Sequence, residues 1–373
     1  MKWLLAIMML LALTAAAEDL TWDLRFRVAA DGGMFFGSGA DSLGSGVELR
    51  RARVILGGRS GRYDAKLDID LAGNEVTLKD AFVRAALAEG LDLRVGNFRT
   101  PFGLEPNTST RDLLFLERSL ALSAFGPGRR VGVEVAWHGQ HGRLALAGLG
   151  QDVNAETDWS RTNQPLTLGG RATWLPWQGD DGLIHIGLAG VWREPDGVDN
   201  QVRFRTRDEI HLTDLKFLDT GDIGLTDQVV QAGAEVMLVH QGWRLQAEAA
   251  LIRTMRACLT DLDFQGATVQ LAHRWGATHD YRPEKAVIGR LKPGAGGAWE
   301  AGLRWSQVDL NDEEVLGGRG SVWTAGVSWF PDRMVRVTAA WLHVDHDVQA
   351  DGAGSLPGDL DYDAVMIRCR FAL

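Results

Sequence analysis

The sequence has few of the residues that cross-link a small secreted domain or hold a metal. Two cysteines, Cys258 and Cys369, are too few to staple 373 residues, and no CxxC motif or Cys/His cluster predicts a zinc site. Acidic residues (49) outnumber basic ones (39), so the net charge of −10 gives no basic footprint for nucleic acid. Motifs such as G-x-S-x-G, the P-loop and H-E-x-x-H are missing, and we predict no enzyme, cofactor or metal.

Long hydrophobic runs are also missing beyond the first residues. Met1-Lys2 precedes an apolar run from Trp3 to Leu13, and small residues ending at Ala17 follow it. This order predicts a secretory signal peptide over residues 1–17, cleaved after Ala17, with a buried N-terminal helix as the alternative. No later segment reaches about 18 uninterrupted apolar residues, so no transmembrane helix is predicted. The remainder, 18–373, is expected to be one domain that could enter a membrane only as strands.

Alternation of apolar and polar residues recurs along the rest of the chain. Between residues 62 and 71 (RYDAKLDIDL) every odd position is apolar and every even position is charged. A period of two gives a strand two chemically different faces. Most tryptophans fall in the apolar phase of such runs, as the aromatic belts of a membrane barrel require, although the core of a β-sandwich would give the same periodicity.

The connections between these runs have two lengths. Short links fit tight hairpin turns, as at 57–61, 88–90, 139–142, 241–242 and 331–333, whereas long connections occupy 31–46, 99–128, 150–166, 193–227 and 345–360. Short turns at one end and long loops at the other are typical of outer-membrane barrels.

Counting the runs gives 17 candidate strands, which would leave the two chain ends at opposite rims. We therefore assign 201–207 (QVRFRTR) to a long loop and predict an all-β fold, a closed antiparallel transmembrane β-barrel of about 16 strands. This assignment leaves one long connection, about 277–297, on the short-turn side without an explanation.

Five short motifs follow one another between residues 47 and 137: VELRRAR (47–53), LKDAF (78–82), VGNFRTPFGLE (95–105), FLERSL (115–120) and PGRRVG (127–132). In this order they resemble the phosphate-selective porin O and P family of bacterial outer membranes, and similar stretches continue at 297–300, 308–312 and 329–331. The resemblance implies an outer-membrane location in contact with lipid and a homotrimer. It also implies a long third loop, 99–128, folded into the lumen to narrow a path for anions.

Arginines are concentrated where that narrow path would lie. Guanidinium groups attract anions and present a fork of donors that suits phosphate oxygens. The predicted pore and anion-binding residues in and after the third loop are Arg99, Arg111, Arg118, Arg129 and Arg130, and the lumen phase of the strands adds Arg51, Arg53 and Arg94. A possible anion funnel in the loop 193–227 consists of Arg203, Arg205 and Arg207.

The same arginines could instead pair with carboxylates and only hold the wall together. Acidic residues share the lumen phase (Asp64, Asp68, Asp70, Asp80 and Asp92) or lie in the third loop itself (Glu105, Asp112 and Glu117). Lysine clusters of the kind that phosphate-specific members use are missing, so phosphate or polyphosphate comes from the resemblance and not from these residues.

The sequence therefore predicts a channel for passive diffusion of small anions, selected by an arginine-lined constriction. A general or weakly selective porin without phosphate preference is the main alternative. A barrel sealed by its third loop, a barrel enzyme and a secreted carbohydrate-binding β-sandwich also stay open.

Overall fold

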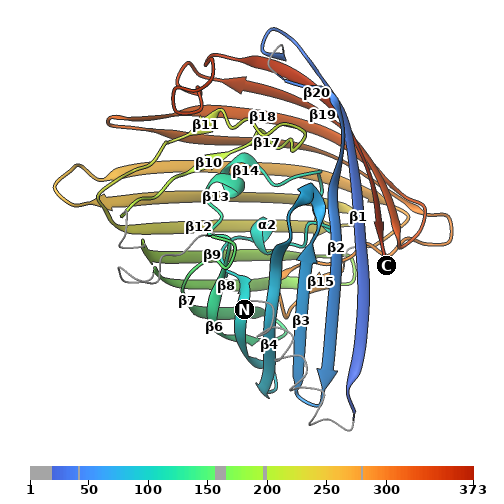
Figure 1. Cartoon of the computed structure of the whole chain (residues 1–373). Helices are drawn as coiled ribbons and strands as arrows, with labels where there is room; N and C mark the ends of the chain where they lie inside the picture. The colour runs from blue at the N-terminus through green and yellow to red at the C-terminus, as the bar shows by residue number, and fades with distance from the viewer. Residues whose placement is uncertain (1–18, 41–42, 156–164, 196–199, 279) are drawn as a thin grey trace.

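The computed structural model describes residues 19–40, 43–155, 165–195, 200–278 and 280–373. Sixteen antiparallel strands close into one barrel in chain order, because β1 pairs with both β2 and β20 (Figure 1). The prediction of a closed, all-β barrel of 16 strands is confirmed. The predicted signal peptide, residues 1–17, lies outside the described residues and stays a prediction.

The wall contains sixteen strands of eight to sixteen residues. They are β1 (Thr21–Phe36), β2 (Gly46–Ser60), β3 (Tyr63–Asp70), β4 (Thr77–Ala88), β5 (Leu91–Arg99), β6 (Arg129–His138), β7 (Gly142–Leu149), β8 (Leu166–Gly179), β9 (Gly182–Glu194), β12 (Thr226–His240), β13 (Trp243–Arg256), β14 (Leu262–Trp275), β17 (Ala298–Asp312), β18 (Val315–Phe330), β19 (Val335–His346) and β20 (Asp361–Ala372).

Short elements lie in the connections between these strands. Two pairs of two-residue strands form separate sheets, β10 (Arg205–Thr206) with β11 (Leu218–Asp219) and β15 (Tyr281–Arg282) with β16 (Val287–Ile288). The helical turns are η2 (Ala72–Asn74), α2 (Leu104–Asn107) and α3 (Leu120–Ala124). In the described part of the chain no helix is long and apolar enough to cross a membrane.

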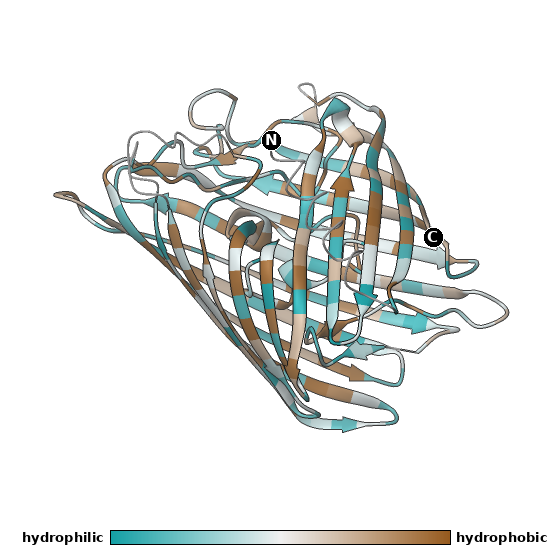
Figure 2. Cartoon of the chain, turned by 60° about the horizontal axis from the view of Figure 1, so that its bottom comes forward, coloured by the Kyte–Doolittle hydropathy of each residue, from teal (hydrophilic) through white to brown (hydrophobic). Residues whose placement is uncertain are grey.

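The two faces of the wall differ as the alternation predicted. On β20, Arg368 and Arg370 are buried, whereas Val365, Ile367 and Phe371 are exposed. In a closed barrel the buried phase faces inward, so the charged side chains line the interior and the large apolar ones lie outside. Figure 2 shows the resulting bands of hydrophilic and hydrophobic residues along the strands.

The sorting of connections by length is also present, with two exceptions. The segment 201–207 belongs to the loop between β9 and β12, as the even strand count predicted, because β10 pairs with β11 and with no wall strand among the described residues. The link from β17 to β18 is a tight turn at the long-loop end, and the long connection after β14 lies at the short-turn end. The first long loop is shorter than the predicted 31–46, because β1 continues pairing with β20 as far as Phe36.

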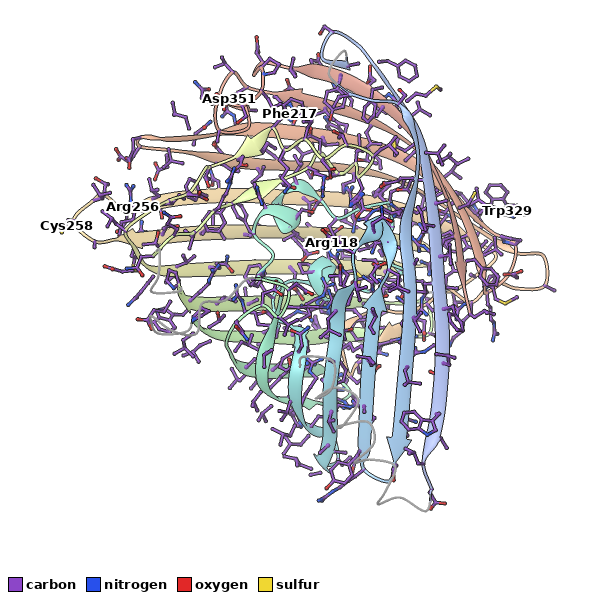
Figure 3. The ribbon with its side chains drawn as sticks, viewed as in Figure 1. Arg118, Phe217, Arg256, Cys258, Trp329 and Asp351 are labelled. Carbon is purple, nitrogen blue, oxygen red and sulfur yellow. The ribbon has the colours of Figure 1, made fainter. Side chains whose placement is uncertain are left out.

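The two ends of the barrel are marked by labelled side chains in Figure 3, with Cys258 at one end and Trp329 at the other. Trp329 stacks on Trp299 with ring centroids 6.0 Å apart, and both are exposed on the outer face. Such paired indoles fit an aromatic belt near one rim. Both cysteines are free.

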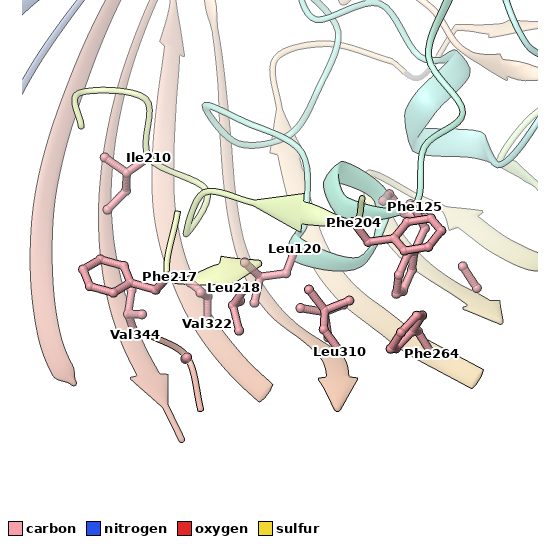
Figure 4. Close-up of a cluster of buried hydrophobic side chains, with 14 of the residues drawn as sticks. Leu120, Phe125, Phe204, Ile210, Phe217, Leu218, Phe264, Leu310, Val322 and Val344 are labelled. Atoms are coloured by element: carbon pink, nitrogen blue, oxygen red, sulfur yellow. The ribbon is translucent and has the colours of Figure 1, made fainter. Parts of the chain in front are cut away.

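The main apolar core lies on the inner side of the wall, toward the long-loop end. We call residues 100–128 the third loop and residues 195–225 the fifth loop. Phe125 of the third loop contacts Phe204 of the fifth loop edge-on at 5.9 Å, and Phe204 contacts Phe264 of β14 at 5.7 Å. Figure 4 shows this cluster continuing through Phe217 to Val344 of β19. Burial of these side chains fixes both loops to the wall.

Candidate functional site

Wall arginines hold the backbone of the third loop. Arg304 of β17, Arg336 of β19, and Arg368 and Arg370 of β20 all donate hydrogen bonds to carbonyl oxygens between residues 111 and 117. Arg336 reaches the Leu113 carbonyl at 2.6 Å. A buried carbonyl without a donor costs about 1–3 kcal/mol, so these four arginines satisfy a segment that could not otherwise be buried.

The beginning of the third loop is fixed from another part of the wall. Glu248 of β13 accepts the backbone N–H groups of Leu104 and Glu105, at 2.7 and 2.9 Å, at the first turn of α2. Glu105 in turn accepts the N–H and the hydroxyl of Ser119, at 3.0 and 2.8 Å. Together with the arginines of β17, β19 and β20, these bonds connect the third loop to inward-facing side chains on well-separated strands.

Glu117 is the carboxylate around which the tip of the third loop is organised. It pairs with Arg50 at 2.8 Å, Arg51 at 3.3 Å and Arg368 at 2.7 Å. A bulge in β2 brings the first two together, because Ala29 pairs with Arg51 while the next residue of β1 pairs with Leu49. Burial alone would raise the pKa of Glu117, but the three guanidinium groups hold that pKa well below its usual range.

The variant Glu117→Gln should destabilise the folded protein by about 1–3 kcal/mol, because three guanidinium groups lose their shared charge partner. The pKa of Glu117 is lower in the folded than in the unfolded protein, so this stabilisation is complete above the unfolded pKa of about 4.3 and is lost as the pH falls further. Unfolding of the wild type and the variant by guanidinium chloride, between pH 2 and 7, measures the free energy of unfolding of each. The difference between the two free energies should be constant above about pH 5 and should shrink below it. A difference independent of pH would contradict the role of the ionised carboxylate.

A cavity of about 610 Å³ lies beside the third loop, between the first seven wall strands and the β15–β16 segment. Its lining includes thirteen arginine and lysine side chains and eight carboxylates. Of the predicted anion-binding residues, those that line this cavity are Arg53, Arg94, Arg99, Arg111 and Arg129. Arg51 instead contacts Glu117, and Arg130 donates to the carbonyl of Gly150 at 3.2 Å.

Most of the predicted arginines in this cavity have a carboxylate partner. The pairs are Arg53 with Asp70 at 3.1 Å, Arg94 with Glu134 at 2.7 Å, Arg111 with Asp112 at 2.8 Å and Arg129 with Asp80 at 2.7 Å. The structural alternative considered for these residues is therefore realised at each of the four. Their charges are largely compensated by carboxylates of the same wall or loop.

Two arginines beside the third loop differ from these pairs. Neither Arg27 of β1 nor Arg99 of β5 has a carboxylate within 4.0 Å among the residues that the structure describes. Arg27 donates to the hydroxyl of Ser109 at 3.2 Å, and Arg99 donates to the carbonyl of Pro106. Arg27 is absent from the predicted set, although its alternation with Phe26 and Val28 gave it the lumen phase.

A second cavity of about 180 Å³ lies between the third and fifth loops. Arg118, which Figure 3 shows between the two ends of the barrel, lines it together with Arg50, Arg205, Arg207 and Lys216. Burial lowers the pKa of Arg118 to about 10, which leaves it charged at neutral pH.

The carboxylates that line the second cavity are already bonded. Glu117 is held by its three arginines, and Glu209 pairs with Arg304. Of the predicted funnel residues, Arg205 and Arg207 line the cavity, and Arg207 also pairs with Asp214 at 2.6 Å. Arg203 lies outside the lining and pairs with Asp219 at 2.6 Å.

The unexplained connection after β14 packs against the inner face of the wall. Arg171 of β8 donates to the carbonyls of Lys285 and Ala286, at 3.1 and 2.9 Å, and His185 of β9 bonds the hydroxyl of Tyr281 at 2.8 Å. We call residues 281–288 the inner hairpin. Its length is explained by this inward course, which brings Arg282, Glu284 and Lys285 into the lining of the large cavity.

The histidines near the end of β19 contact carboxylates but do not gather around a shared point. His343 contacts Asp363 at 3.1 Å and Asp361 at 3.7 Å, and His346 contacts Asp208 at 2.9 Å. Over the ranges of chain that the structure describes, no group of three or more His, Cys, Asp or Glu side chains could hold a metal ion.

A closed sixteen-stranded barrel with a charged interior and an apolar outer face is the architecture of an outer-membrane channel. The chain belongs to the phosphate-selective porin O and P family, whose model matches residues 23–373. It is 22% identical to Porin O of Pseudomonas aeruginosa, over 92% of this chain and 87% of that protein. The predicted family and the predicted outer-membrane location are confirmed.

Solved porin structures share the fold at low sequence identity. The trimer form of OmpT, an outer-membrane protein of Vibrio cholerae, aligns with 95% of this chain and 100% of its own, with a TM-score of 0.61 and 10% identity. The anion-selective porin from Comamonas acidovorans aligns over the same shares with a TM-score of 0.59 and 10% identity. These likenesses establish the barrel architecture.

Proposed function

We propose that the protein is an anion-selective porin in which the third loop folds into the lumen and small inorganic anions pass along its positively charged edge. The observation that carries this proposal is the contrast between the paired arginines of the large cavity and the lining arginines that have no carboxylate within 4.0 Å in the described chain, among them Arg27 and Arg99. A cation whose charge is not compensated locally attracts a passing anion most strongly.

The distribution of charge supports an anion path in an acidic protein. The chain has a net charge of −10, but cations exceed carboxylates by thirteen to eight around the large cavity and by five to two around the second cavity. A water-filled path with low-dielectric walls responds to these nearby charges more than to charges on the outer loops. Arg118, Arg205 and Arg207 would receive anions at the long-loop end, and Arg99 and Arg27 would pass them on.

Phosphate is the proposed preferred solute, on the basis of family membership and of the donor geometry of guanidinium groups. The alternative is a general porin, and the carboxylate pairing of Arg53, Arg94, Arg111 and Arg129 favours it. The two differ in whether phosphate binds inside the channel or only passes through it.

Inorganic phosphate should reduce the chloride current through the protein reconstituted in a planar bilayer, with saturation as the phosphate concentration rises at constant ionic strength. Binding to Arg27 and Arg99 would slow the exit of phosphate and block chloride. A current that stays unchanged would contradict a phosphate site and leave the general porin.

Assembly and export complete the proposal. We propose a homotrimer, since OmpT of Vibrio cholerae, which shares the fold, has a trimer form. The exposed apolar face would contact outer-membrane lipid, and residues 1–17 would be removed during export, which leaves residues 18–373 as the single barrel domain. Passive diffusion requires no catalytic group or cofactor.

A further inference from the structure

Arg370 of β20 is a buried charge with almost no protein partner. Its side chain is 7% exposed, and its one hydrogen bond in the described chain is to the carbonyl of Arg111, at 2.5 Å. No carboxylate of the described residues lies within 4.0 Å of its guanidinium group. The preceding inward residue of the same strand differs, because Arg368 pairs with Asp31 at 2.5 Å and with Glu117 at 2.7 Å.

A second buried arginine lies directly opposite on the neighbouring strand. Arg336 of β19 pairs in register with Arg370, and both side chains face inward. Arg336 donates to the hydroxyl of Ser328 at 2.9 Å and to carbonyls of the third loop, and its nearest carboxylate, Glu300, is 3.9 Å away. Like charges in this cross-strand position repel, and beyond Glu300 the wall offers Arg336 only the ring of Phe330, 5.0 Å from its guanidinium carbon, among the described residues. Arg370 has neither contact, so the pair lacks a full counter-charge.

The carboxylates that line the space around Arg336 and Arg370 already accept hydrogen bonds from other groups. Glu300 accepts two hydrogen bonds from Arg274, at 2.6 and 3.1 Å, and Asp112 accepts two from Arg111, at 2.8 and 3.1 Å. Asp332 accepts the backbone N–H groups of residues 334 and 335. Six arginines and only these three carboxylates line the space between the third loop, β19, β20 and the end of the inner hairpin.

That space is a cavity of about 30 Å³, larger than the roughly 10–15 Å³ that one water molecule needs. It lies at the short-turn end, because its lining includes Asp332, Arg333 and Ala372. It is separate from the 610 Å³ cavity, with which it shares only Arg111, Asp112 and Gly289. A small anion could enter it from that end without crossing the proposed constriction.

We infer that this cavity binds one small inorganic anion, which bridges Arg336 and Arg370 and holds the third loop against β19 and β20 at the short-turn end. The ion would act as the counter-charge for the two arginines and would stay in place during conduction. Chloride and phosphate share the required chemistry. The inference goes beyond the proposed function, because the site lies off the anion path and does not require that the channel prefer anions.

Crystals of the mature protein, residues 18–373, soaked in bromide provide the first test. Anomalous diffraction at the bromine edge should place bromide between Arg336 and Arg370 in the wild-type protein and should show none there in Arg370→Gln. No bromide in the wild-type cavity, or an equal peak in Arg370→Gln, would overturn the inference.

Hydrogen exchange tests the link to the third loop. In detergent, amides of residues 111–117 should exchange about tenfold more slowly in chloride or phosphate at ten times the dissociation constant than in gluconate at equal ionic strength. Arg370→Gln should lose this dependence, Arg370→Lys should keep part of it if Arg370→Gln does not fold, and Arg253→Gln, which replaces an exposed arginine paired with Asp263, should retain it in full. Comparison of the chloride and phosphate arms identifies the preferred ion, and equal exchange in all three salts would contradict the inference.

The outcome is separable from that of the proposed function. A channel without phosphate block could still show bromide at Arg370, and a phosphate-blocked channel could lack it.

Discussion

The double variant Arg27→Gln/Arg99→Gln should lose most of the preference for chloride over potassium. Each substitution removes a cation that has no carboxylate partner in the described chain. The charge that is lost was not already neutralised by a neighbouring acid, so a passing anion loses its full attraction. A unit charge about 4 Å from an ion contributes about 1 kcal/mol even in bulk water and more in a narrow path. The chloride-to-potassium permeability ratio should therefore fall at least about fivefold for each arginine.

Arg253→Gln provides the matched control for this experiment. Arg253 pairs with Asp263 at 2.5 Å, both side chains are more than half exposed, and neither lines a cavity described above. Arg253→Gln removes one positive charge, as Arg27→Gln and Arg99→Gln each do. The chloride-to-potassium permeability ratio of this control should stay close to that of the wild type. An equal loss in Arg253→Gln would show that net charge, and not position, sets the preference.

Replacing Glu235 with glutamine should cost about 3–5 kcal/mol of stability. Glu235 of β12 pairs with Arg171 at 2.5 Å and with His185 at 2.8 Å, and all three side chains are at most 1% exposed. The variant leaves Arg171 buried without a charge partner and weakens its hold on the inner hairpin. Equilibrium unfolding in guanidinium, on protein refolded in detergent, measures the loss.

Glu314→Gln is the exposed counterpart of this variant. Glu314 also pairs with an arginine, Arg256, but its side chain is 60% exposed at the long-loop end. Exposed ion pairs contribute about 0–1 kcal/mol to stability, so the free energy of unfolding of this variant should hardly differ from that of the wild type. A loss below about 1 kcal/mol for Glu235→Gln as well would mean that the buried network does not fix the hairpin.

The fold could be predicted because the residues of each barrel strand alternate between its outer and inner faces, so the pattern is visible in the local sequence. Each run between turns has one apolar phase and one charged phase, and parity correctly removed 201–207 from the wall. The inner hairpin could not be predicted in the same way. Its place is decided by Arg171 and His185, which lie about a hundred residues earlier in the chain.

The candidate site was only partly predictable for the same reason. The sequence places arginines in the lumen phase, but cross-strand neighbours decide which of them are neutralised. Arg53 meets Asp70 because β2 and β3 pair in that register, whereas Arg27 meets Ser109 of the third loop. Arg50 joins Glu117 through a bulge that a regular alternation does not predict.

The reversal potential of the wild-type protein in a gradient of potassium chloride tests the central claim most directly. The claim is that the surplus of cations in the lumen outweighs the net charge of −10 carried by the whole chain. The predicted result is a reversal potential shifted from zero toward the equilibrium potential of chloride. A reversal potential of zero, or one shifted toward the equilibrium potential of potassium, would contradict the claim.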